Sequence, residues 1–165
     1  MKKVTLIFGS VIGLVLSSNS IIHMNMMYSN LDYKGNDVIG YATMVIIFSV
    51  IYFGVRNYRD KHLDGKIGFS KAFKTGALIC FIASTYYVVL GLLYYYLFVP
   101  DFMDVYADYI IRNSSVSELE ANTTQMASFK EMSKNPLFLA LFSYFEVLPI
   151  GMIIALASAF IVKKK

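Results

Sequence analysis

Apolar and polar segments alternate along the whole chain, and the lengths of the apolar segments predict its fold. Four of them come close to the roughly 20 residues that a helix needs to cross the hydrocarbon core of a bilayer. They cover residues 4–27, 38–55, 72–99 and 136–162. The pattern predicts an all-α fold, an integral membrane bundle of four transmembrane helices that forms a single membrane domain over residues 1–165.

The ends of the second and fourth apolar segments carry recognisable helix signals. Asn135 is a good helix cap, Pro136 suits the first helical position, and three lysines end the fourth segment. Asp37 is the expected cap of the second segment, which we expect to stop at Arg56. We also expect the first segment to be an uncleaved anchor, since no clear Ala-x-Ala site follows it.

The stretch of residues 100–135, between the third and fourth segments, is long and polar. It contains two amphipathic patterns, one after Asp101 and one after Ser117, which are too short and too polar to span. Ser117 and Glu120 have the spacing of a capping box. We therefore predict a helical extracytoplasmic loop whose two helices lie on the membrane surface or cap the bundle.

The distribution of basic residues predicts the orientation in the membrane. With both termini in the cytoplasm, eleven basic residues fall on the cytoplasmic side and four on the other. The segment between the second and third spans contributes most, and we expect it to set the topology or to contact anionic lipid headgroups. Its basic residues include Arg56, Arg59, Lys61, Lys71 and Lys74.

Composition supports a membrane protein and narrows its chemistry. The chain is 57% hydrophobic with a mean hydropathy of +0.57, which is too apolar for a soluble domain of this size. The net charge of +4 does not indicate nucleic-acid binding, because the basic residues flank apolar segments instead of forming one face. Cys80 is the single cysteine and lies in an apolar run, so no intramolecular disulfide and no thiolate metal cluster can form.

Small residues recur every four positions in three of the predicted spans. This spacing lets helix backbones approach closely in lipid, where packing drives helix association. The three stripes exceed what one four-helix bundle needs and so favour association with a second copy or another membrane protein. The packing residues we single out are Gly9, Gly13, Gly76, Gly151 and Ala155.

Several short motifs resemble those of one known family. They comprise Asn57 to Lys61 (NYRDK), Gly68 to Gly76 (GFSKAFKTG), Val99 to Phe102 (VPDF), and Lys134 to Phe138 (KNPLF), which leads on to Glu146 and to Pro149 to Gly151 (PIG). With these motifs the chain resembles the DUF4199 proteins, bacterial multi-pass membrane proteins found mostly in Bacteroidota and without an established function. The resemblance implies a small multi-pass protein of the bacterial inner membrane and supplies no catalytic residues.

Glu146 is the strongest candidate for a functional residue, because an ionisable group in a membrane span is costly unless other groups solvate it. Counting residues along the helices places four polar side chains near its depth: Asn19, His23, Tyr41 and Tyr87. Such a group could hold a proton or a cation. The alternative is that Glu146 is protonated and fixes helix packing through hydrogen bonds.

For function, the sequence favours a non-enzymatic membrane protein that acts through association, as an accessory or scaffold subunit or as a homo-oligomer. The alternative is a small proton- or ion-coupled transporter or channel that uses Glu146. His23 and His62 fall near opposite membrane faces, so they cannot form a metal site within one chain. We expect no cofactor, no metal and no nucleic acid, and as partners the lipid bilayer and a second copy or another membrane protein.

Overall fold

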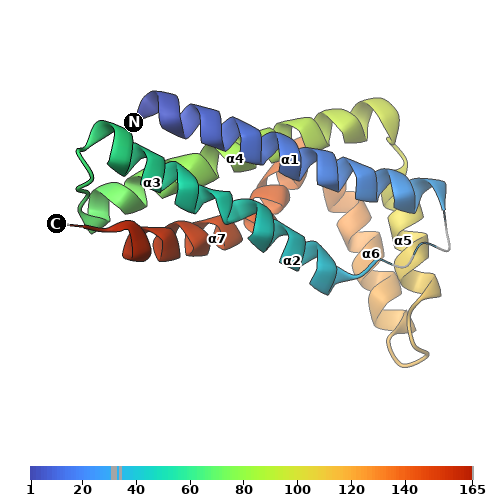
Figure 1. Ribbon diagram of the computed structural model, residues 1–165. Helices are drawn as coiled ribbons and strands as arrows, with labels where there is room; N and C mark the ends of the chain where they lie inside the picture. Colours follow the sequence, from blue (N-terminus) through green and yellow to red (C-terminus); the bar gives the residue numbers. More distant parts are fainter. Residues whose placement is uncertain (31–32, 34, 165) are drawn as a thin grey trace.

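The computed structural model describes residues 1–30, 33 and 35–164, with the backbone alone for Asp37, and in these residues helices follow one another along the chain (Figure 1). Four helical stretches are long and apolar enough to cross a membrane, which confirms the predicted all-α fold. They are Lys2–Ser29, Val38–His62, Phe69–Phe98 and Pro136–Val162. The helices are α1 (Lys2–Ser29), α2 (Asp37–Phe48), α3 (Val50–His62), α4 (Phe69–Phe98), α5 (Phe102–Arg112), α6 (Leu119–Ser133) and α7 (Pro136–Val162).

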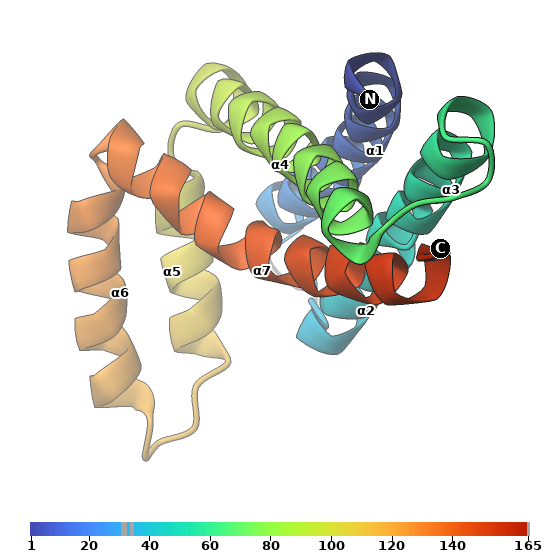
Figure 2. The same ribbon diagram turned by 90° about the vertical axis from the view of Figure 1, so that its left-hand side faces the viewer.

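The spanning helices lie side by side, with both chain termini at one end of the bundle (Figure 1). Helix α4 packs against α1 and against α7, while α2 and α3 cover the remaining side (Figure 2). We call the end with the two termini and the α3–α4 loop the termini end, and the opposite end the hairpin end, because α5 and α6 form an antiparallel pair there (Figures 1 and 2).

The second span consists of two helices and is longer than its apolar segment. Ser49 separates α2 from α3, and its hydroxyl donates to the Val45 carbonyl at 2.7 Å. The predicted end of this span at Arg56 is wrong, because α3 continues to His62. Arg56 pairs with Asp60 one turn later, at 3.5 Å, so the polar residues extend the helix beyond the apolar segment.

The predicted caps are confirmed at α7 and wrong at two other helices. Asn135 accepts a hydrogen bond from the Leu137 N–H at 2.9 Å, with Pro136 in the first turn. At α2 the capping residue is Asn36 instead of Asp37, because its side chain accepts from the Ile39 N–H at 3.2 Å. Lys34, expected in the link before α2, lies outside the described residues.

The predicted capping box at Ser117 and Glu120 does not form, because α6 begins at Leu119 with Glu118 as its capping position. The Glu118 carboxylate turns back and accepts from the hydroxyl of Ser115 at 2.5 Å and from its N–H at 3.4 Å. These two hydrogen bonds stabilise the charged form and lower the pKa of Glu118. The connection from α5 to α6 is therefore fixed by Ser115.

The three small-residue stripes face the interior of the bundle. Gly13 of α1 lies against α4, where a Cβ would be 2.5 Å from Tyr86 Cβ. Gly76 also lies close to α7, since a Cβ there would be 3.0 Å from Ala155 Cβ. Gly151 in turn faces α4, where a Cβ would meet the Sγ of Cys80. The stripes therefore hold this bundle together, as small residues do in membrane helix packing.

The α5–α6 pair confirms that residues 100–135 form two helices, and side chains attach this pair to the bundle. The Tyr28 hydroxyl of α1 donates to the Asp101 carboxylate at 2.8 Å, and Phe129 of α6 contacts the ring of Phe142 of α7 with centroids 5.0 Å apart. Asp104 of α5 forms an ion pair with Lys130 of α6, which raises the pKa of that ammonium group. The pair runs across the bundle axis (Figure 1).

Candidate functional site

Helix α7 positions Glu146 just before the place where its course changes. Proline has no N–H to donate and its ring crowds the preceding turn, so Pro149 inside α7 favours a bend. Figures 1 and 2 show that the two halves of α7 run in different directions. Ser143 and Glu146 share a helical face, and both side chains line a cavity between α7 and the rest of the bundle.

The cavity has a volume of about 540 Å³ and lies toward the hairpin end. Its lining residues come from six helices, α1, α2, α4, α5, α6 and α7, and from the link before α2. Half of them are phenylalanine, tyrosine or methionine side chains, and a small set of polar groups is added to this largely apolar wall. The polar side chains of the spanning helices in the wall are Ser20, His23, Tyr87, Tyr95, Ser143 and Glu146.

A chain of long hydrogen bonds joins three spanning helices at the inner end of the cavity. The Tyr87 hydroxyl of α4 donates to Glu146 Oε2 at 3.4 Å. The Ser20 hydroxyl of α1 donates to the Tyr87 oxygen at 3.5 Å. The long distances indicate weak bonds, so Glu146 keeps most of its acceptor capacity for another group in the cavity.

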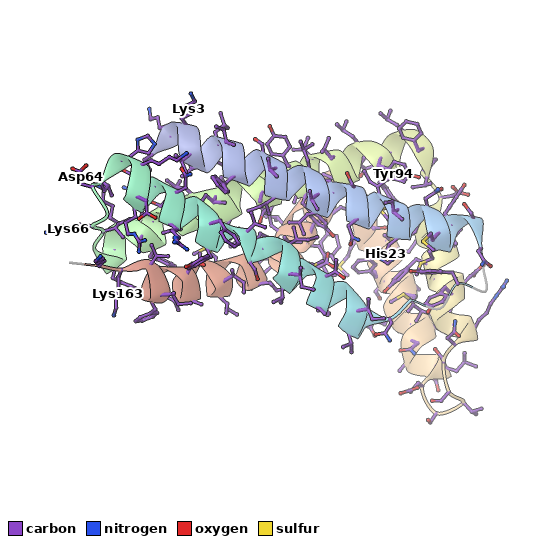
Figure 3. All side chains as sticks on the ribbon, viewed as in Figure 1. Lys3, His23, Asp64, Lys66, Tyr94 and Lys163 are labelled. Carbon is purple, nitrogen blue, oxygen red and sulfur yellow. The ribbon has the colours of Figure 1, made fainter. Side chains whose placement is uncertain are left out.

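His23 lines the same cavity but bonds to a different residue. Its Nδ1 lies 2.7 Å from the hydroxyl of Tyr33, in the link between α1 and α2. Figure 3 places His23 toward the hairpin end, away from the labelled Lys3, Lys66 and Lys163 at the termini end. Among the described residues, no group of three or more His, Cys, Asp or Glu side chains is placed to hold a metal ion.

The structure brings together three of the five candidate residues, and two lie elsewhere. Glu146, His23 and Tyr87 line the cavity, whereas Asn19 and Tyr41 do not. Tyr41 is 51% exposed on the outer face of α2, and Asn19 is partly buried. Asn19 and Tyr41 were predicted to lie near Glu146 because they have a similar depth in the membrane. Depth does not determine the direction in which a side chain points around its helix.

Sequence reasoning missed Ser20, although the signal for it was present. Ser20, Met24 and Met27 are spaced by four and three residues, which puts them on one face of α1, and all three line the cavity. Ser17 continues this face toward the termini end, where it is buried. The spacing of these serine and methionine residues therefore predicts which face of α1 packs against the other helices.

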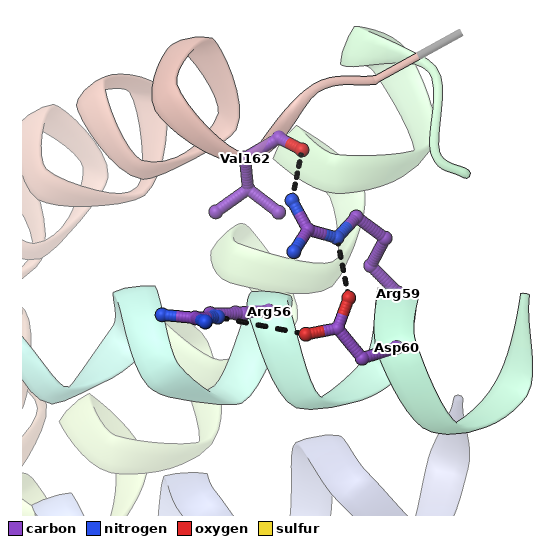
Figure 4. A network of polar contacts seen from close by, with 4 residues as sticks. All are labelled: Arg56, Arg59, Asp60 and Val162. Carbon is purple, nitrogen blue, oxygen red and sulfur yellow. Dashed lines mark hydrogen bonds and ion pairs between the residues drawn. The ribbon is translucent and has the colours of Figure 1, made fainter. Parts of the chain in front are cut away.

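A second polar cluster fastens the termini end (Figure 4). The Arg59 guanidinium donates from Nη1 to the Val162 carbonyl at 3.0 Å and from Nε to Asp60 Oδ1 at 2.6 Å. Beside it, the backbones of Ile67 and Lys164 pair in both directions, at 2.8 and 2.9 Å. Arg59 therefore caps the last turn of α7, in addition to the role in topology expected from its charge. The other basic residues of this segment that we singled out as lipid contacts, Lys61, Lys71 and Lys74, are exposed.

Comparison with known proteins supports the resemblance noted in the sequence. A family model described as "Protein of unknown function (DUF4199)" matches residues 7–164, nearly the whole chain. No curated protein and no solved structure matches it. The cavity and the polar clusters are therefore interpreted from their own geometry.

Proposed function

The chain belongs to the DUF4199 family of proteins of unknown function, and from its structure we propose that this multi-pass membrane protein is a non-enzymatic binder of a small molecule. The observation that supports this proposal is the cavity of about 540 Å³ beside Glu146. Its size falls within the range of roughly 300–1,000 Å³ typical of ligand pockets, and it combines an apolar wall with a few polar groups. Glu146 and His23 each bond to a tyrosine and not to each other, so the cavity lacks a paired acid and base.

The packing below the cavity favours binding over passage through the bundle. Toward the termini end the core is closed by Phe48, Ile51 and Val147, whose side chains are all 0% exposed. A transporter or channel that used Glu146 would need this layer to open, so the ion-coupled alternative has less support. A receptor or a ligand-carrying subunit needs access from one side only.

Association, the function that the sequence favours first, also has less support. Part of its motivation was an excess of small-residue stripes, but those stripes pack inside the bundle against Tyr86, Cys80 and Ala155. A homo-oligomer or a membrane protein partner would have to use other surfaces. Size measurement in mild detergent would favour association if it showed a stable dimer or a bound protein.

We propose that the protein lies in the bacterial inner membrane with both termini in the cytoplasm, so that the cavity opens toward the outer side. The basic residues at the termini end support this orientation, since positive charge is retained in the cytoplasm. A reporter enzyme that is active only outside the cytoplasm should be inactive when fused after Lys164 and active when fused within residues 113–118. The reverse pattern would contradict the orientation.

The cavity itself can be tested by cysteine labelling in membrane vesicles. Ser143→Cys should react readily with the water-soluble reagent methanethiosulfonate ethyltrimethylammonium, because residue 143 lines the cavity. The wild type should resist it, since Cys80 is 0% exposed. The double variant Ser143→Cys, Gly91→Leu should react much more slowly, because Gly91 lines the cavity and a Cβ there meets nothing within 4 Å. Equal resistance of Ser143→Cys and wild type would contradict the proposed function.

A further inference from the structure

Among the described residues that line the cavity, Glu146 has the one carboxyl group, and no lysine or arginine is present to pair with it. An anionic ligand would meet this carboxylate without a compensating cation, which is unfavourable. The charge therefore selects against anions and in favour of a positively charged group.

The apolar wall provides a second feature that suits a cation. Tyr87 and Tyr95 of α4 line the cavity together with Phe142 of α7 and Phe102 and Tyr106 of α5. Aromatic faces attract organic cations through the ring quadrupole, and this attraction grows when the cation is removed from water. Methionines from α1, α5 and α6 fill the rest of the wall and adapt to an irregular apolar body.

The surroundings of the cavity point the same way. Residues 100–135, which form the hairpin end, carry six carboxylates and three basic side chains. Asp101, which is exposed, lies at the start of α5 next to the lining residue Phe102, whereas the charge of Asp104 is paired with Lys130. A negative field around an entrance raises the local concentration of cations. The termini end, by contrast, is rich in lysine and arginine.

We infer that the ligand of this cavity is a lipophilic organic cation, whose charged centre pairs with Glu146 while its apolar body lies against the tyrosine, phenylalanine and methionine side chains. The inference rests on the proposed function and adds to it the chemical class of the ligand. One carboxylate suits one positive charge. Tyr87 donates only a weak, 3.4 Å hydrogen bond to Glu146, so the carboxylate can still accept a cationic group.

The test compares two ions of almost identical shape and opposite charge, tetraphenylphosphonium and tetraphenylborate. The full chain is placed in nanodiscs of phosphatidylcholine, and binding of each ion is measured by equilibrium dialysis, with empty nanodiscs subtracted. We expect saturable binding of the phosphonium ion at least about tenfold tighter than that of the borate. This comparison uses the wild type and does not depend on the folding of any variant.

Two variants locate the effect. Glu146→Gln keeps the shape of the side chain and removes its charge, so phosphonium binding should weaken about tenfold and borate binding should not. Gly91→Leu places a larger side chain in the cavity and should weaken binding of the phosphonium ion at least about tenfold. Melting temperatures of both variants show whether each is folded.

The outcomes separate the two proposals. The inference is overturned if the two ions bind equally while Gly91→Leu reduces their binding. It is also overturned if Glu146→Gln leaves phosphonium binding unchanged. In both cases the cavity binds ligands without selecting for positive charge. If neither ion binds above the empty nanodiscs, or Gly91→Leu leaves the binding of both ions unaffected, the cavity does not bind such molecules and the proposed function fails as well.

Discussion

Gly13→Leu is expected to destabilise the protein strongly, by about 1–3 kcal/mol or more. A Cβ at this position would lie 2.5 Å from Tyr86 Cβ, 2.9 Å from the Ala83 carbonyl oxygen and 3.1 Å from Ala83 Cα. All three are backbone atoms or the first atom of a side chain, so they cannot move unless α1 and α4 separate. The melting temperature of the detergent-solubilised protein measures the effect.

Gly91→Leu is the matched control, because it makes the same substitution on α4 where there is space. A Cβ at Gly91 meets nothing within 4 Å. The higher helix propensity of leucine should make this variant as stable as the wild type or more stable, by about 0.5–1 kcal/mol. If Gly13→Leu melted at the same temperature as Gly91→Leu, the close packing of α1 on α4 would be wrong.

The fold could be predicted because hydrocarbon allows few solutions. A span must satisfy its own backbone hydrogen bonds, so length and hydropathy alone identify the four membrane helices. The ends of helices are less constrained by lipid, and several competing residues can cap one turn. Asn36 and Asp37 stand next to each other before α2, and the sequence offers no rule for choosing between them.

The candidate site could be predicted only in part, for a geometrical reason. Counting residues at a fixed rise places Tyr87 near the depth of Glu146, and the structure shows their hydroxyl and carboxylate 3.4 Å apart. The rotation of each helix about its own axis, which directs Tyr41 away from the cavity, depends on packing between helices. The contribution of α5 and α6 to the wall also depends on how the hairpin docks, which a local pattern does not encode.

The small-residue stripes illustrate a related ambiguity. Spacing of four residues predicts that a helix face meets another helix at close range, and Gly13, Gly76 and Gly151 do so. It does not predict whether the second helix belongs to the same chain. Because α4 packs with α1 on one side and with α7 on another, it receives the stripes of α1 and α7 and presents its own stripe to α7.

Arg59→Leu is the second change expected to have a large effect, a loss of about 1.5–3 kcal/mol of stability. The Arg59 side chain is 18% exposed and holds the last turn of α7 through the Val162 carbonyl, at 3.0 Å (Figure 4). Leucine keeps the apolar bulk but removes both donors, which leaves the carbonyl at the end of α7 without this partner. Unfolding in detergent with increasing sodium dodecyl sulfate measures the difference, and Arg59→Lys should be intermediate because an ammonium group lacks the planar fork.

Arg56→Leu is the control, since it removes the same charge from the same helix. Arg56 is 53% exposed and its contact is a 3.5 Å ion pair with Asp60, a type of surface pair that contributes little to stability. Both variants lower the positive charge at the termini end equally, so a purely topological role for these arginines predicts equal effects. A much larger loss for Arg59→Leu would show that the guanidinium acts by capping α7. Equal losses would instead mean that the hydrogen bond from Arg59 to the Val162 carbonyl adds no stability beyond the effect of the positive charge of Arg59.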